Sequence, residues 1–104
     1  MTQSFNDYQN RSIRLTDERL AHILDHPEML ELESQISTVL QEPQVVRQSS
    51  SDSQVQLYYR YYEQTMVGAK WLCVVVKHLS DDAFIITAYL TDKLKQGVDL
   101  WQNL

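Results

Sequence analysis

Three side chains that could act on a phosphate lie in two apolar runs near the centre of the sequence. Lys77 interrupts the run 71–79, where a buried cation needs a compensating partner. Thr87 and Tyr89 bring hydroxyl groups into the second run, 83–91. A lysine and two hydroxyls are groups that stabilise negative charge developing on oxygen. We therefore expect the function of the protein to be carried out near these three side chains.

Whether the three side chains meet depends on how the two runs pair. Both runs are rich in β-branched and aromatic residues, and the polar break at 80–82 predicts a β-hairpin. Lys77 shares a face with Thr87 and Tyr89 if paired residues have numbers that add up to an even value. A slip of one residue separates them, because strand faces alternate. The alternative for Lys77 is a snorkelling or ion-paired cation.

Two histidines lie one turn apart in a predicted helix. The helix is expected to begin after an N-cap at Thr16 and to end at Asp25, because Pro27 disfavours the helical conformation at the preceding residue. His22 and His26 share one stripe of this helix, and imidazole titrates near neutrality, as a general acid or base does. The run HILDH lacks the glutamate of an HExxH site, so we expect no metal. Two exposed histidines without a chemical role are the alternative.

An unusually dense group of tyrosines surrounds one arginine in the predicted strand 55–63, VQLYYRYYE. Alternation along the strand predicts that Tyr58, Arg60 and Tyr62 point to the same side. Tyrosines on a sheet can stack nucleobases, and arginine can hold a phosphate. Packing in a core or an interface is the commoner use of such tyrosines, and this alternative stays open.

The other predicted elements would position these groups. Residues 1–12 are polar and aperiodic, which predicts a flexible arm, and residues 13–104 are predicted to form a single α+β domain. A second helix is predicted over 28–41, because apolar residues recur at steps of three and four. With a first strand at 44–48, the predicted fold is two N-terminal helices packed on a four-stranded antiparallel β-sheet.

Composition limits the classes of function. The chain has 104 residues and a formal net charge of −5, which weighs against non-specific nucleic-acid binding. The acids gather in 17–42, whereas residues 45–77 of the sheet-forming part carry four cations and two acids. The single cysteine, Cys73, excludes an intrachain disulfide, and we expect a buried thiol. No apolar run reaches the roughly 20 residues of a membrane helix, and no secretory signal is evident. A cytoplasmic location is therefore expected.

Several motifs occur in an order that resembles a known family. RLTDERLAHILDHPEM is followed by YYRYY, by VVVKHL and by FIITAYLTDKLKQG with a later tryptophan. Over residues 13–101 the chain resembles a phage- and bacteria-associated family of small predicted nucleases with the barnase–EndoU–colicin–RelE fold. The resemblance implies the same helices on a four-stranded sheet. It also implies cleavage of RNA without metal or cofactor. We therefore expect a toxin-like endonuclease that is controlled by a protein inhibitor or antitoxin, or by its delivery.

The resemblance also implies roles for individual residues. The ribose 2′-hydroxyl would attack the adjacent phosphate, with His22 as base or acid. Arg60 and Lys77 would stabilise the pentavalent phosphate, and Thr87 and Tyr89 would orient it. Substrate contacts are expected from His26, Tyr58 and Tyr62.

Two non-catalytic alternatives remain. One is a binding module whose tyrosine-rich sheet face takes a protein or an RNA, and the other is a subunit whose tyrosines form a homodimer interface. The nuclease requires His22 or His26 to meet Arg60 and Lys77 in one cleft. If Arg60 and Lys77 face opposite sides of the sheet, the binding module is favoured.

Overall fold

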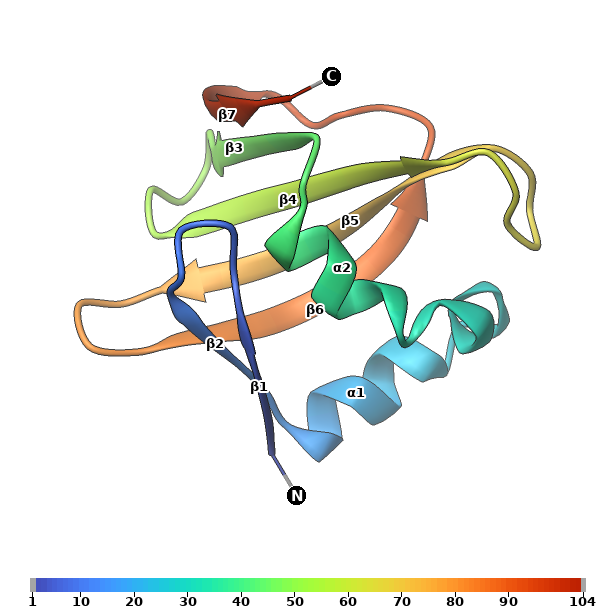
Figure 1. Ribbon diagram of the computed structural model, residues 1–104, viewed down its shortest axis with the longest axis horizontal. Helices are drawn as coiled ribbons and strands as arrows, with labels where there is room; N and C mark the ends of the chain where they lie inside the picture. The colour runs from blue at the N-terminus through green and yellow to red at the C-terminus, as the bar shows by residue number, and fades with distance from the viewer. Residues whose placement is uncertain (1, 104) are drawn as a thin grey trace.

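The structure, a computed structural model, describes residues 2–103 and is built on a seven-stranded sheet with helical segments against it (Figure 1). The helical segments are α1 (Asp17–Leu24), the 3-10 helix η1 (Pro27–Leu32) and α2 (Gln35–Gln41). The strands are β1 (Gln3–Asn6), β2 (Ser12–Leu15), β3 (Val45–Ser49), β4 (Val55–Tyr62), β5 (Lys70–His78), β6 (Ala83–Thr91) and β7 (Gly97–Gln102).

The predicted four-stranded antiparallel sheet under two N-terminal helices is wrong. The order across the sheet is β1-β2-β6-β5-β4-β3-β7. The four predicted strands, β3 to β6, do form an antiparallel meander. Two strands before the helices extend one edge, and β7 extends the other. Because β2 runs parallel to β6, pairing Arg14 with Phe84, the sheet is mixed.

The segment predicted to be a flexible arm contains β1. This strand pairs with β2 from Gln3 opposite Leu15 to Asn6 opposite Ser12. The connecting turn closes on the side chain of Asp7, whose Oδ1 accepts hydrogen bonds from the backbone N–H groups of Gln9 and Arg11. A carboxylate that satisfies nearby backbone donors is a strong local turn device.

The first helix agrees with its prediction, and the second is shorter. The Thr16 hydroxyl caps α1 by accepting a hydrogen bond from Arg19 N at 3.2 Å. The helix ends at Leu24, and Pro27 then opens η1. The predicted helix over 28–41 divides into η1 and α2, with a break at 33–34. None of the helices in the described part of the chain is long and apolar enough to cross a membrane.

Two apolar clusters lie on opposite faces of the sheet. The larger one packs the helical segments, through Ile23, Met29 and Ile36, against strands such as β5. Figure 1 shows α2 in front of β5 and β6. The smaller cluster includes Tyr59 and buried Cys73, and burial raises the pKa of that thiol to about 12. The thiol is therefore protonated and structural.

The segment 92–96 covers the smaller cluster. It leaves β6 and must reach β7 beyond β3, so it crosses the sheet. Leu94 packs against the smaller cluster, and Lys95 N donates a hydrogen bond to the Tyr59 hydroxyl at 3.0 Å. The crossing segment therefore gives this face of the sheet a partial second layer.

The attachment of β7 can be tested at Gly97. A Cβ at this position would collide with the carbonyl oxygen of Gln48 in β3. We expect Gly97→Ala to lower the free energy of unfolding by about 1–3 kcal/mol, as overpacking does, in urea denaturation. Gln96→Ala, one residue earlier, is the control. Equal stability of both variants would show that β7 does not approach β3 this closely.

Candidate functional site

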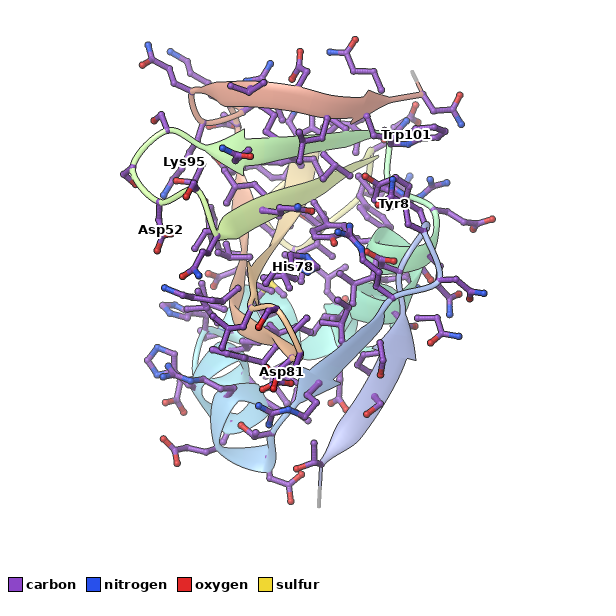
Figure 2. The ribbon with its side chains drawn as sticks, turned by 90° about the vertical axis from the view of Figure 1, so that its left-hand side faces the viewer. Tyr8, Asp52, His78, Asp81, Lys95 and Trp101 are labelled. Carbon is purple, nitrogen blue, oxygen red and sulfur yellow. The ribbon has the colours of Figure 1, made fainter. Side chains whose placement is uncertain are left out.

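A groove of about 450 Å³ lies on the sheet face that the helices leave free. One wall is the serine-rich loop 49–52 between β3 and β4, and the other is formed by Lys95 and Gln96. Thr87 and Tyr89 line it from β6. Figure 2 shows Lys95 and Asp52 on this side of the sheet.

A β-bulge brings the predicted side chains to the same face. Lys77 pairs with Phe84, so the two residue numbers add up to an odd value at this end of the hairpin. The register then shifts between Val75 and Val76. Beyond the shift, Val75 pairs with Thr87, and the sum is even. Lys77 and Val75 share a face because they are two residues apart, so Lys77, Thr87 and Tyr89 lie on one face. Without the bulge, the pairing of Lys77 with Phe84 would continue along the strands and would place Thr87 and Tyr89 on the opposite face from Lys77. The bulge shifts the register by one residue and brings the three side chains to the same face.

The two lysines of this face are already in contact with other groups. Lys77 Nζ is 3.0 Å from Asp52 Oδ2. A hydrogen bond from Gln54 N and the nearby Lys77 lower the pKa of Asp52. Lys95 Nζ lies 5.5 Å from the centre of the Tyr89 ring, a cation–π distance. Lys95 therefore lines the groove, and Lys77 is held beside it by Asp52, which is also a lining residue.

The Tyr89 hydroxyl is buried and has no hydrogen-bond partner among the described residues. Burial and the neighbouring Cys73 raise the pKa of Tyr89 well above its ordinary value. This hydroxyl is therefore a proton donor at neutral pH and cannot serve as a base.

Arg60 lies on the opposite face from Lys77. It pairs with Leu72 of the larger cluster, whereas Lys77 pairs with Val55 of the smaller one. Arg60 Nη1 donates a hydrogen bond of 2.6 Å to the carbonyl oxygen of Glu42, just after α2. A cation at the C-terminal end of a helix stabilises it. The structure therefore gives Arg60 a capping contact, away from the groove.

The helix histidines are not part of the groove. His22 and His26 are exposed, and His26 Nδ1 is 3.8 Å from Glu28 Oε1. No hydrogen bond or ion pair within residues 2–103 joins either histidine to Lys77. The geometry agrees with the alternative of two exposed histidines. Of the five residues proposed for catalysis, Lys77, Thr87 and Tyr89 come together, and His22 and Arg60 do not join them.

The tyrosines predicted to contact substrate are engaged inside the protein. The Tyr62 hydroxyl donates to Gln35 Oε1 of α2 at 2.9 Å. The Tyr58 hydroxyl donates to Asp7 Oδ2 at 2.8 Å and lies 2.9 Å from His78 Nε2. Both rings point to the helix side of the sheet, where they pack with the larger cluster.

A polar network that the sequence did not reveal surrounds Tyr58. Asp7 is only 4% exposed, and its Oδ2 accepts from Arg11 Nε at 2.9 Å. Arg11 Nη2 also approaches the Tyr58 hydroxyl at 3.2 Å. Hydrogen bonds from Arg11 and Tyr58 outweigh burial and lower the pKa of Asp7. The available signal was the Asp-x-x-x-Arg spacing around the turn.

The network fixes the tautomer of His78. Tyr58 has one hydroxyl proton, which it donates in the hydrogen bond to the Asp7 carboxylate. Neutral His78 must then carry its proton on Nε2 and donate it to the Tyr58 oxygen. Burial and the nearby Arg11 lower the pKa of His78 below 6.5, although Asp7 acts in the other direction. Figure 2 shows His78 near the end of β5.

Known proteins give no guide to the function of this chain. No family model, no curated protein and no solved structure matches the chain. Within the described residues, no group of three or more His, Cys, Asp and Glu side chains could hold a metal ion.

The lowered pKa of His78 predicts a pH dependence of stability. The folded protein binds fewer protons than the unfolded chain between pH 6.5 and the lower folded pKa, so stability falls as the pH drops through that window. We expect His78→Gln to remove this part of the slope in urea unfolding measured from about pH 7.5 to about pH 5. Exposed His26→Gln is the control and keeps the slope. An unchanged slope in His78→Gln contradicts the assignment.

Proposed function

We propose that the protein is a non-catalytic RNA-binding module and that its groove takes a segment of single-stranded RNA. The observation that carries the proposal is the gathering of Lys77, Lys95 and several hydroxyl groups on one face of an acidic protein. Phosphate contacts by lysine and hydroxyl groups provide sequence-independent affinity for a nucleic-acid backbone.

The local charge around the groove favours an anionic ligand, although the net charge of the whole chain does not. Arg47 lies beside the groove, where its Nη1 donates to Lys95 O at 2.8 Å and its Nε contacts Asp99 at 2.6 Å. The three cations Arg47, Lys77 and Lys95 face the two carboxylates of Asp52 and Asp99, which leaves one positive charge. The net charge of the chain is −5. Binding should therefore be moderate and sensitive to salt.

Hydroxyl groups and rings extend the surface along the same face. Ser50 is exposed at the tip of the loop and makes no hydrogen bond with the described residues, so its hydroxyl is available to a phosphate. Tyr61, 42% exposed, lies further along β4 with its ring 5.2 Å from that of Trp71. Val55 and Tyr61 are about 20 Å apart along an extended strand. The segment 92–96 covers Tyr59 between these two points, so a single strand of RNA would pass over this segment to contact the lysines at one end and stack a base on Tyr61 at the other.

The groove is better suited to binding than to cleavage. Its lining residues include no histidine. The pKa of Asp52 is lowered and that of Tyr89 is raised, so neither titrates near neutrality. Arg60, the expected second stabiliser, faces the other side. These observations favour binding without chemistry.

Metal-independent RNA cleavage is the second candidate function. It is favoured by the placement of Lys77, Thr87 and Tyr89 on one face and by the motif resemblance described above. It would need a proton-transfer group, such as His22, to reach RNA bound at the groove.

RNA binding can be tested with two matched lysine variants. Lys77 and Lys70 lie in the same strand, and each contacts an aspartate, at 3.0 and 2.6 Å. By alternation they lie on opposite faces. We expect Lys77→Ala and Lys95→Ala to weaken binding of a labelled single-stranded RNA in fluorescence anisotropy. The slope of log K against log salt should become shallower by about 0.7 for each phosphate that the variant no longer neutralises. Lys70→Ala should leave both quantities unchanged.

Equally weakened binding in Lys70→Ala, or no binding at low salt, would overturn the proposal. The same RNA incubated in EDTA distinguishes the second candidate. Cleavage that falls by about a hundredfold or more in His22→Ala would establish the nuclease in place of the binding module.

A further inference from the structure

A second pocket lies on the other side of the sheet from the groove. It has a volume of about 560 Å³, within the range of small-molecule sites. The β1–β2 turn, the end of α2, β4 and β7 each contribute to it. Figure 2 shows Tyr8 and Trp101 on the side of the sheet opposite Lys95 and Asp52.

Two aromatic rings form a fixed wall of this pocket. The rings of Tyr8 and Trp101 are 5.3 Å apart with an interplanar angle of 37°. Tyr8 is held from behind by an edge-to-face contact with Tyr58, at 6.1 Å. The Trp101 indole N–H donates to Pro43 O at 3.4 Å. Trp101 is nevertheless 41% exposed, so a large part of its indole is available for stacking.

The rest of the lining is polar and largely without partners. The side-chain amides of Gln9, Gln41 and Asn103 make no hydrogen bond with the described residues. The carboxylate of Glu42 has no ion-pair partner among them either. Arg60 also lines the pocket, and its Nη1 donates to the carbonyl oxygen of Glu42.

We propose that this pocket binds a nucleotide, with the base stacked on Trp101. A primary amide presents a donor and an acceptor side by side, which matches the edge of a nucleobase. Glu42 can accept hydrogen bonds from ribose hydroxyls, and Arg60 supplies a positive charge for the phosphate. Glu42 and Arg60 together give the lining no net charge, so a neutral saccharide could use the ring, the amides and Glu42, but it has no anionic group for the Arg60 guanidinium. The arginine therefore favours a nucleotide.

The ligand could be a free nucleotide or an unpaired nucleotide of a bound RNA. The chemistry of the pocket is the same in both cases. The inference does not depend on the groove, because Lys77 and Lys95 do not line this pocket. Lys77→Ala should therefore bind a mononucleotide as the parent protein does.

The experiment uses the fluorescence of Trp101. The chain contains two tryptophans, and Trp71 lies on the other face, so Trp71→Phe leaves Trp101 as the single reporter. We expect saturable quenching by adenosine 5′-monophosphate. Ribose 5-phosphate, which lacks the base, should bind at least about tenfold more weakly, as the absence of one stacked base predicts. Glucose is the neutral saccharide control.

Calorimetric titration then tests the lining residues. Trp101→Leu should weaken nucleotide binding by at least about tenfold, whereas Leu100→Ala, an exposed neighbour in β7 that does not line the pocket, should not. Because Trp101→Leu could release β7, the exposed amides provide a second test. Gln41→Ala and Asn103→Ala should weaken binding several-fold without changing the midpoint of unfolding.

Three results would overturn the nucleotide site. These are the absence of saturable quenching at millimolar nucleotide, equal binding of ribose 5-phosphate or glucose, and unchanged affinity in both amide variants. If the site exists, competition with single-stranded RNA assigns the source. An unpaired nucleotide of RNA is the ligand if the two compete, and a free nucleotide is the ligand if they bind independently.

Discussion

The buried carboxylate of Asp7 is the interaction on which the arrangement of the other elements depends. It closes the β1–β2 turn through backbone hydrogen bonds and contacts the Arg11 guanidinium, and it accepts a hydrogen bond from the Tyr58 hydroxyl in β4. A buried charge is tolerated only when it is paired and hydrogen-bonded. Here the pairing joins a local turn to the central strands. The turn also places Tyr8 against Trp101, so the edge strand β7 is held by this constraint as well.

Strand alternation divides the molecule into two functional faces. Along β4, Tyr58 and Arg60 point to the helix side, while Tyr59 and Tyr61 point to the side of the groove. One dense run of tyrosines therefore serves two surfaces with different chemistry. The face toward the helices has hydrogen-bonded tyrosines and a capping arginine. The other face combines a small apolar cluster with cations at its rim.

Some of this structure could be predicted from the sequence because its signals are local. Thr16 and Pro27 mark the two ends of α1, and apolar runs separated by polar breaks mark the four strands of the meander. The three strands outside the meander could not be predicted, because β1, β2 and β7 are short and lack a long hydrophobic period. They form where the sheet offers an unpaired edge, and that depends on the completed fold.

The candidate site could be predicted only in part, because its geometry also depends on the completed fold. The sharing of a face by Lys77 and Thr87 was conditional on register, and no local pattern announced the bulge between Val75 and Val76 that decides it. The spacing of Asp7 and Arg11 marks only the turn, whereas Tyr58 and His78, which complete the network, lie far from it in the chain, so no spacing rule includes them. The sequence around Arg60 suggests a chemical role, whereas its contact with Glu42 arises only when α2 packs near β4.

The path of 92–96 across the sheet has a consequence for the order of assembly. Strand β7 is the last strand in the chain and pairs with β3, which lies beyond β4 and β5, so the crossing segment and β7 are synthesised after the whole meander. Until then Tyr59 and Cys73 lack the cover that Leu94 provides. A chain still emerging during synthesis would therefore expose an apolar sheet face for a time, the kind of surface that chaperones recognise.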